Sequence, residues 1–254
     1  MAKTVGIVIP AYKPDVSRLV TYASSLLYEI DSAKVHIELD DPTGEVDLGS
    51  TSLPDAISVN TESRRRGKGA AITHGFEILN TEYLAFSDAD GSTPVSSVKD
   101  VLNGLSNASL CVGSRRHPDA VIEAHQTIFR RFLGDGFAWS ARKLLAVQLS
   151  DYQCGVKAVT RDAWQKIRTH LYQPGFAWDL EVVAVAHAFG YDITEVPITW
   201  HDSAGSTVNP LTTALELGRT LLQLRFRTQS LGTDQSARNQ AASPSLVEQL
   251  ESKQ

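Results

Sequence analysis

Up to residue 113, the chain alternates short, mostly apolar runs with segments whose apolar residues recur every three or four positions. Short apolar runs are typical of strands buried on both faces of a sheet, and the three-to-four spacing is typical of amphipathic helices. The pattern predicts strands at 5–9, 35–39, 57–60, 83–87 and 110–113, and helices at 16–30, 69–79 and 95–105. Such alternation with short connections predicts an α/β fold with a mostly parallel sheet.

The second half of the chain follows a different pattern. Further elements are expected as a long helical stretch at 128–149, a segment at 155–160, helices at 161–171 and 178–189, and a last strand at 193–200. Asn209-Pro210 is a favourable helix start, and it predicts an amphipathic helix at 211–227. From residue 228 the chain is rich in Gln, Ser, Ala and Asn, so a disordered tail is expected at 228–254. The remaining residues, 1–210, form the predicted single α/β domain.

Composition narrows the function classes. The 254 residues carry 24 basic and 29 acidic side chains, and the net charge of −5 argues against a broad nucleic-acid-binding surface. No run of 18 apolar residues and no apolar signal-peptide core occurs, so a cytoplasmic location is expected. Cys111 and Cys154 match no disulfide or zinc pattern, and both are expected to be reduced thiols.

Polar clusters follow several of the predicted strands. They lie at 10–14, 40–44, 87–94 and 113–117. Because ligands of open parallel sheets bind beyond the carboxyl ends of the strands, these clusters predict a site at one edge of the sheet.

The sharpest cluster is Asp88-Ala89-Asp90-Gly91, directly after the strand at 83–87. Two carboxylates on alternate residues suit a hard cation, Mg²⁺ or Mn²⁺, whose other ligands are water and substrate phosphate. For an isolated Asp-x-Asp, a helix cap and a turn are the favoured explanation.

A basic loop precedes the predicted helix at 69–79. It contains Arg64, Arg65, Arg66 and Lys68 with two glycines, and helix N-termini favour anions. A solvated basic turn is the alternative reading. Neither a Walker A spacing nor a Gly-x-Gly-x-x-Gly after the first strand is present, which excludes ordinary ATPases and dinucleotide-binding enzymes.

Several motifs in order resemble a known family. They are Ile-Pro-Ala-Tyr-Lys at 9–13, Arg-Gly-Lys-Gly-Ala-Ala at 66–71, Ser-Asp-Ala-Asp-Gly-Ser-Thr-Pro at 87–94, Val-Gly-Ser-Arg-Arg at 112–116 and Glu-Val-Pro-Ile-Thr-Trp at 195–200. The chain resembles family 2 glycosyltransferases with the GT-A fold from about residue 4 to 210. Asp-Tyr-Gln-Cys-Gly-Val-Lys at 151–157 and Trp-Asp-Leu-Glu at 178–181 are similar to dolichyl-phosphate glucosyltransferases and dolichyl-phosphate mannose synthases.

The resemblance implies a nucleotide-sugar site. In this site the nucleotide is lined by Pro10, Ala11 and Tyr12, and the base or ribose is contacted by Asp40 or Asp41. The donor is also bound by Arg66, Lys68 and Asp88. Asp88 and Asp90 bracket the metal and the diphosphate. The family pattern Asp-Asp-Gly-Ser is replaced here by Asp-Asp-Pro-Thr at 40–43. The proline removes a backbone donor, which leaves open which of the two aspartates touches the nucleoside.

The resemblance also implies an acceptor side. Arg115 and Arg131 are expected to bind the acceptor phosphate, for which a planar bidentate donor is well suited. Asp151 and Gln153 are the candidate catalytic residues, although Asp151 could instead orient the acceptor, cap a turn or pair with Lys157. Asp179 and His201 are minor candidates; His201 either approaches the metal or is a structural polar residue.

The function implied is transfer of a hexose from a nucleotide-diphosphate sugar to a polyprenyl phosphate, with inversion. UDP-glucose is favoured as donor over GDP-mannose, and Mg²⁺ or Mn²⁺ is the expected cofactor. The helix at 211–227 either lies on the cytoplasmic face of a membrane or packs against the domain. The alternatives are a glycosyltransferase for a soluble or glycan hydroxyl, a nucleotide-sugar-binding protein without turnover, and a nucleotidyltransferase.

Overall fold

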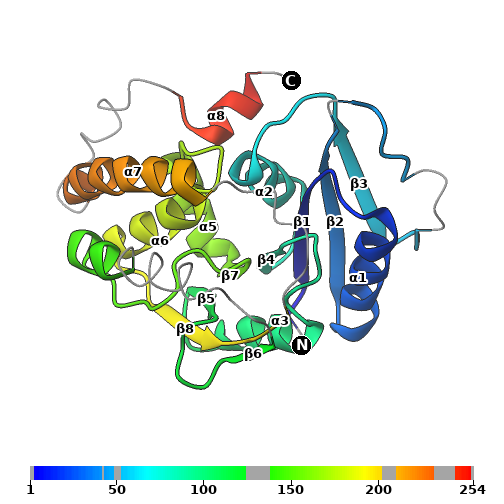
Figure 1. Cartoon of the computed structure of the whole chain (residues 1–254), viewed down its shortest axis with the longest axis horizontal. Helices are drawn as coiled ribbons and strands as arrows, with labels where there is room; N and C mark the ends of the chain where they lie inside the picture. The colour runs from blue at the N-terminus through cyan, green and yellow to red at the C-terminus, as the bar shows by residue number, and fades with distance from the viewer. Residues whose placement is uncertain are drawn as a thin grey trace.

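The computed structural model describes residues 3–41, 43–48, 53–123, 138–201, 210–231 and 244–252. Its centre is a seven-stranded sheet in the order β3-β2-β1-β4-β7-β5-β8 (Figure 1). The strands are β1 (Val5–Tyr12), β2 (Ala33–Asp40), β3 (Ile57–Glu62), β4 (Tyr83–Ser87), β5 (Leu110–Ser114), β7 (Val156–Thr160) and β8 (Ile193–Pro197). Every neighbouring pair is parallel except those of β7, which runs antiparallel to β4 and β5. The predicted mostly parallel α/β fold is confirmed.

Helices cover both faces of this sheet. α1 (Val16–Glu29) and α3 (Val95–Gly104) pack on one face, and α2 (Lys68–Ile78), α5 (Arg161–Ile167) and α6 (Trp178–Ala188) pack on the other. Side chains alternate along β1, so that Ile7 and Ile9 enter the core under α1 while Val8 enters the core under α2. Burial on both faces explains why these strands read as continuous apolar runs.

The predicted strand at 193–200 is two strands in the structure. β8 ends at Pro197, and β9 (Thr199–His201) pairs with β6 (Val121–Glu123) in a small parallel sheet that the sequence pattern did not predict. The backbone N–H of His201 donates to the carbonyl of Ser92 at 2.9 Å, so β9 lies beside the loop that follows β4.

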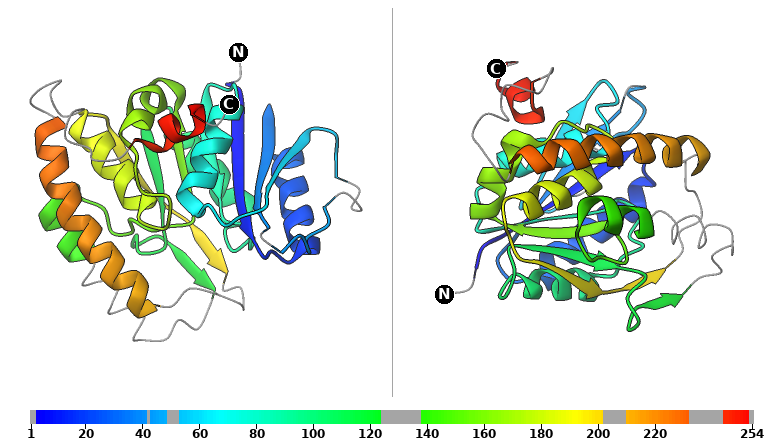
Figure 2. Two further views of the ribbon diagram at one scale, coloured as in Figure 1. Left: turned by 90° about the horizontal axis from the view of Figure 1, so that it is seen from above. Right: turned by 90° about the vertical axis from the view of Figure 1, so that its left-hand side faces the viewer.

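The C-terminal region is more ordered than its composition predicts. α7 (Pro210–Leu231) runs four residues beyond the expected end and lies along α6 (Figure 2), with Leu221 and Leu224 buried. α8 (Leu246–Glu251) begins at a capping box, and Leu246 and Val247 are buried. The prediction of disorder is therefore wrong for 228–231, which continue α7, and for 244–252, where a capping box and two buried apolar side chains stabilise α8.

The expected helical stretch at 128–149 is described only in part. Residues 138–145 are helical, and the helix stops before Ala146, which adopts a φ of 57°. Arg131 lies outside the described residues, as does Arg130. In the described part of the chain, no helix combines the length and the apolar character needed to cross a bilayer.

Candidate functional site

The carboxyl ends of β1, β2 and β4 bring most of the predicted donor residues to one edge of the sheet. Tyr12 pairs with Asp40 at the last position of the β1–β2 ladder, and Asp88 directly follows β4. The guanidinium of Arg65 lies over the Tyr12 ring, 4.2 Å from its centroid. The side chain of Ala11 is buried in the core, so only its backbone is placed to face a ligand, and Pro10 is half-buried.

Asp40 is engaged by the basic loop. Its carboxylate accepts hydrogen bonds from the backbone N–H of Arg66 at 2.6 Å, from that of Gly67 at 3.1 Å, and from Nε of Arg66 at 2.7 Å. Gly67 has a φ of 99°, and a Cβ there would lie 2.5 Å from the carbonyl oxygen of Pro174. From the sequence, an anionic ligand is expected at the N-terminus of this helix. The backbone N–H groups of Arg66 and Gly67 donate to Asp40 instead.

Arg66 is part of a buried polar cluster rather than of the open edge. Its NH2 donates to Oε2 of Glu38 at 2.7 Å, and Asn60 donates to the same oxygen at 3.0 Å. His36 and His74 lie 2.7 and 2.6 Å from Oε1 of Glu38. Burial opposes ionisation of Glu38, yet its hydrogen-bond partners, His36 and His74 first, lower its pKa to about 2. The expected contact of Arg66 with the donor is not supported, since its side chain is 7% exposed and bound to two carboxylates.

Asp41 orders its own turn. It accepts hydrogen bonds from the Thr43 hydroxyl and from the backbone N–H groups of Gly44 and Val46. The bond from Val46 is the main reason that its pKa lies below the usual range. Both aspartates of this strand end therefore have internal partners, and their contact with a nucleoside stays a prediction.

Asp88 and Asp90 lie at the open edge. Lys68 Nζ is 2.9 Å from Asp88 Oδ1, and the backbone N–H of Asp88 donates to the Gly155 carbonyl at 2.9 Å. A Cβ on Gly155 would lie 2.2 Å from Asp88 Oδ2, so the glycine gives this carboxylate its room. Asp90 is exposed and accepts hydrogen bonds from the backbone and hydroxyl of Ser92.

This pair of carboxylates suits a divalent cation. Among the described residues no three His, Cys, Asp or Glu side chains cluster as a complete protein-only metal site. Mg²⁺ and Mn²⁺ accept carboxylate oxygens and complete their coordination with water and substrate phosphate, so two partly exposed aspartates are a fitting donor set.

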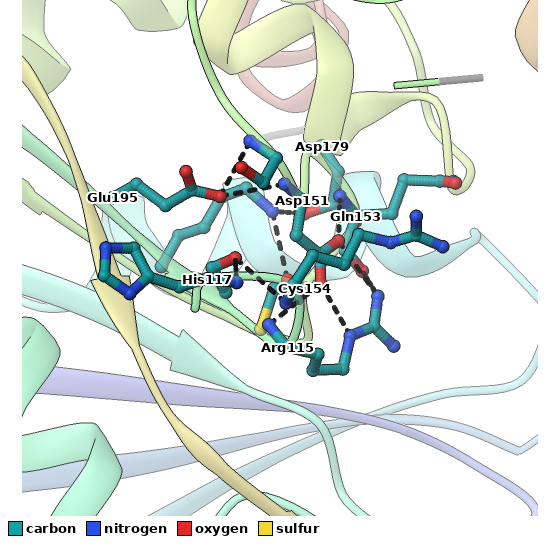
Figure 3. A network of polar contacts seen from close by, with 11 residues as sticks. Arg115, His117, Asp151, Gln153, Cys154, Asp179 and Glu195 are labelled. Carbon is teal, nitrogen blue, oxygen red and sulfur yellow. Dashed lines mark hydrogen bonds and ion pairs between the residues drawn. The ribbon is translucent and has the colours of Figure 1, made fainter. Parts of the chain in front are cut away.

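Arg115 and Asp151, which are expected from the sequence on the acceptor side, form an ion pair (Figure 3). Arg115 donates from Nε to Oδ2 of Asp151 at 2.7 Å and from NH2 to Oδ1 at 3.0 Å. The backbone N–H of Gln153 donates to the same carboxylate at 3.2 Å. Burial alone would raise the pKa of Asp151, but the neighbouring guanidinium of Arg115 lowers that pKa to about 2. Lys157, which was considered from the sequence as a partner of Asp151, is paired with Asp179 instead.

Glu195 completes this arrangement, and the sequence reasoning did not single it out. Its Oε1 accepts the backbone N–H groups of Ser150 and Asp151 at 2.8 and 2.9 Å (Figure 3). The only sequence signal for it was its place at the start of the Glu-Val-Pro motif. His201 is 3.0 Å from Glu123 across the small sheet, which fits the structural reading of this histidine.

Comparison with known proteins identifies the family of the central segment. Residues 47–168 match the model described as Glycosyl transferase family 2. Dolichyl-phosphate beta-glucosyltransferase of Mus musculus is 32% identical over 180 residues, which are 68% of this chain and 56% of that protein. The corresponding protein of Saccharomyces cerevisiae is 29% identical over 179 residues, which are 65% and 53% of the two chains. The chain thus spans a little over half the length of these relatives.

Solved structures show the same fold. Glucosyl-3-phosphoglycerate synthase from Mycobacterium tuberculosis, in complex with Mn²⁺, UDP-glucose and phosphoglyceric acid, matches with a TM-score of 0.63. The match covers 89% of this chain and 80% of that one at 15% sequence identity. At this identity the likeness shows the fold alone, which is that of GT-A glycosyltransferases.

Proposed function

Because the chain carries a glycosyl transferase family 2 domain on a GT-A fold, we propose that it transfers a hexose from a nucleotide-diphosphate sugar to the phosphate of a polyprenyl lipid, with inversion. The named relatives, dolichyl-phosphate beta-glucosyltransferases, support this acceptor and favour glucose as the sugar. UDP-glucose is the proposed donor, and GDP-mannose is the donor to be tested beside it.

The state of Asp151 is the observation that carries the choice of acceptor. A phosphate monoester is already ionised at neutral pH, since its second pKa is about 6, and it needs positioning rather than deprotonation. A hydroxyl acceptor needs a general base. Asp151, with a pKa of about 2 and both oxygens accepting hydrogen bonds from Arg115, is poorly suited to be that base. Arg115, a quarter exposed, is well suited to orient a phosphate.

On the donor side, Asp88 and Asp90 would hold Mg²⁺ or Mn²⁺. The crystallisation of a GT-A neighbour with Mn²⁺ supports a divalent cation. When bound, the cation stabilises the negative charge that develops on the departing diphosphate. Lys68 contributes a second positive charge beside Asp88, and the stacked Tyr12 and Arg65 flank the place proposed for the nucleoside. No protein group has to remove a proton from the acceptor.

A membrane surface is the proposed location of the acceptor, and α7 is the proposed contact. Leu221 and Leu224 are buried, so that side of the helix packs against the domain. On the opposite side Leu222 and Phe226 lie one turn apart and are 52% and 72% exposed, with exposed Arg219 nearby on the same helix. Exposed apolar side chains with basic neighbours are typical of helices that lie on anionic lipid.

The test is a reconstitution with defined substrates. The purified chain with Mn²⁺ is incubated with UDP-glucose or GDP-mannose and a short polyprenyl phosphate, and the products are analysed by mass spectrometry. We expect hexosyl-phosphoryl-lipid from UDP-glucose and no product from the matched polyprenol, which lacks the phosphate. Transfer to the polyprenol or to a glycan would support the hydroxyl-acceptor alternative. Metal-dependent donor binding without turnover would indicate a binding protein. Release of pyrophosphate in a separate incubation with UTP and glucose 1-phosphate would indicate a nucleotidyltransferase.

A further inference from the structure

Four charged side chains, three from β7, α6 and α2 and one from the loop after β4, alternate in sign between the interior and the open edge. Lys157 Nζ of β7 is 2.6 Å from Asp179 Oδ1 of α6, and Asp179 Oδ2 is 3.2 Å from Lys68 Nζ at the start of α2. Lys68 Nζ is in turn 2.9 Å from Asp88 Oδ1. The exposed fractions of these side chains rise along the series from 2% and 3% to 12% and 40%. Only Asp88, at the outer end, is open enough to meet a ligand.

The inner members of this series, Lys157 and Asp179, are fixed by the fold. Lys157 also donates to the Cys154 carbonyl at 3.0 Å, and Asp179 lies in the first turn of α6, where the helix dipole favours an anion. The ammonium groups of Lys68 and Lys157 lie against the Phe86 ring, 4.8 and 5.6 Å from its centroid, respectively. Lys68 is therefore shared between a buried, anchored carboxylate and an open one.

This sharing has a consequence for Asp88. A carboxylate that is paired with an ammonium group offers less negative charge to a cation than an unpaired carboxylate does. The more strongly Asp179 attracts Lys68, the less Lys68 neutralises Asp88. Lys157 in turn partly neutralises Asp179 and so weakens its attraction for Lys68. We propose that Asp179 and Lys157 are positioning residues that set the affinity of Asp88 and Asp90 for a divalent cation by controlling the hold of Lys68 on Asp88. The inference rests on the proposed function, because it requires a cation at these two aspartates.

The test measures Mn²⁺ binding in the presence of UDP by electron paramagnetic resonance, without turnover. Asp179→Asn leaves Lys68 with Asp88 as its one charged partner among these residues, and we expect Mn²⁺ to bind about tenfold more weakly. Lys157→Met leaves Asp179 without its lysine partner, so that it attracts Lys68 more strongly and Mn²⁺ binds more tightly than in the wild type. General damage to the fold would weaken binding in both variants, so the opposite directions identify the proposed effect.

A double-mutant cycle tests whether Asp179 acts through Lys68. In the Lys68→Met background, Asp179→Asn should no longer change the Mn²⁺ affinity. Glu181→Gln is the matched control, because Glu181 is a buried, ion-paired carboxylate two positions along the same helix whose partner is Arg227. We expect it to leave Mn²⁺ binding unchanged.

The outcomes separate this inference from the proposed function. A wild-type chain that binds no Mn²⁺ with UDP would overturn both. If the wild type binds Mn²⁺ normally, two results would overturn the inference alone. One is unchanged Mn²⁺ binding by Asp179→Asn, and the other is an Asp179→Asn effect that persists in the Lys68→Met background. If Lys157→Met does not fold, the cycle between Lys68 and Asp179 decides.

Discussion

Asp151 accepts two side-chain hydrogen bonds from Arg115, and its own backbone N–H donates to Glu195. These bonds tie together the segment just after β5, the loop before β7, and β8, at the proposed acceptor side. A free arginine at this place would lose side-chain entropy on binding a phosphate, whereas Arg115 is already oriented. Asp151 therefore serves the proposed reaction by holding Arg115 in place.

Asp151→Asn should weaken both the fold and acceptor binding. Arg115 would lose its charged partner at a largely buried place, which we expect to lower the free energy of unfolding by about 3 kcal/mol at pH 7. The KM for polyprenyl phosphate should rise while the KM for UDP-glucose stays near the wild-type value. Urea unfolding and steady-state kinetics measure the two effects. A variant with normal acceptor KM would contradict the role given to Arg115.

The same pair makes stability depend on pH in the acid range. The pKa of Asp151 is about 2 in the folded chain, below the value of about 3.9 for an unfolded aspartate. A lowered pKa stabilises the folded state above the unfolded pKa, and this contribution is lost as pH falls from about 4 to about 2. The unfolding free energies of the wild type and Asp151→Asn should therefore converge over that interval. A gap of constant size down to pH 2 would show that the carboxylate charge is not the cause.

Asp90→Ala should abolish most turnover without affecting the fold. Asp90 is exposed, and its loss removes a proposed metal-binding oxygen, so we expect kcat/KM to fall by at least about a hundredfold. The melting temperature should stay within a degree or two of the wild-type value, since surface substitutions change stability little. Asp119→Ala removes another exposed carboxylate, one that lies near His117, and serves as the control. Equal activities of the two variants would argue against a metal at Asp90.

Glu38→Gln should loosen the basic loop. Glu38 is fully buried and bonded to Arg66, which in turn is bonded to Asp40. We expect faster hydrogen exchange at the backbone amides of Arg66 and Gly67 and a higher KM for the donor. Glu62→Gln on the neighbouring strand is the control, because the Glu62 carboxylate lies 4.0 Å from the guanidinium of Arg64. It should leave both the exchange rates and the KM for the donor unchanged. Unchanged exchange in Glu38→Gln would show that Asp40 orders the loop without help.

Gly155→Ala should displace Asp88. The added Cβ would lie 2.2 Å from Oδ2 and 2.7 Å from Cγ of Asp88, so the carboxylate must move. We expect Mn²⁺ binding in the presence of UDP to weaken about tenfold, as measured by electron paramagnetic resonance. Gly218→Ala in α7 meets open space and provides the matched glycine substitution. The prediction fails if the two alanine variants bind Mn²⁺ alike.

The outer face of α7 should bind lipid. Leu222→Glu combined with Phe226→Glu should abolish sedimentation with vesicles of phosphatidylcholine and phosphatidylserine, because the exposed apolar contact is lost. Gln223→Glu combined with Gln229→Glu adds the same charge to the exposed part of this helix and should retain most of the binding. Activity on a water-soluble, short-chain polyprenyl phosphate should be equal in both double variants. If both pairs lose vesicle binding equally, charge rather than apolar contact is responsible.

Local patterns predicted much of the molecule. The apolar runs placed β1, β2 and β4 within a few residues, and the position of Asp88 and Asp90 after β4 followed directly from the rule for parallel sheets. The pairings of Asp40 with Arg66, of Asp151 with Arg115 and of Asp179 with Lys157 could not be predicted, because each joins elements well apart in the sequence and depends on strand order. α8 was missed for another reason: its capping box is a local signal that a polar composition concealed.

The antiparallel strand β7 has a consequence for how the chain can assemble. β4 and β5 do not pair with each other, because β7 lies between them. The backbone N–H of Asp88 donates to the carbonyl of Gly155, the residue just before β7. A nascent or truncated chain that ends before residue 155 would therefore leave one edge of β4 unpaired and β5 without either neighbour, since β7 and β8 both come later in the chain. Unpaired strand edges invite association with other chains. The first 150 residues contain nearly every donor-side side chain discussed above, yet the strand that joins β4 to β5 in the sheet comes after them.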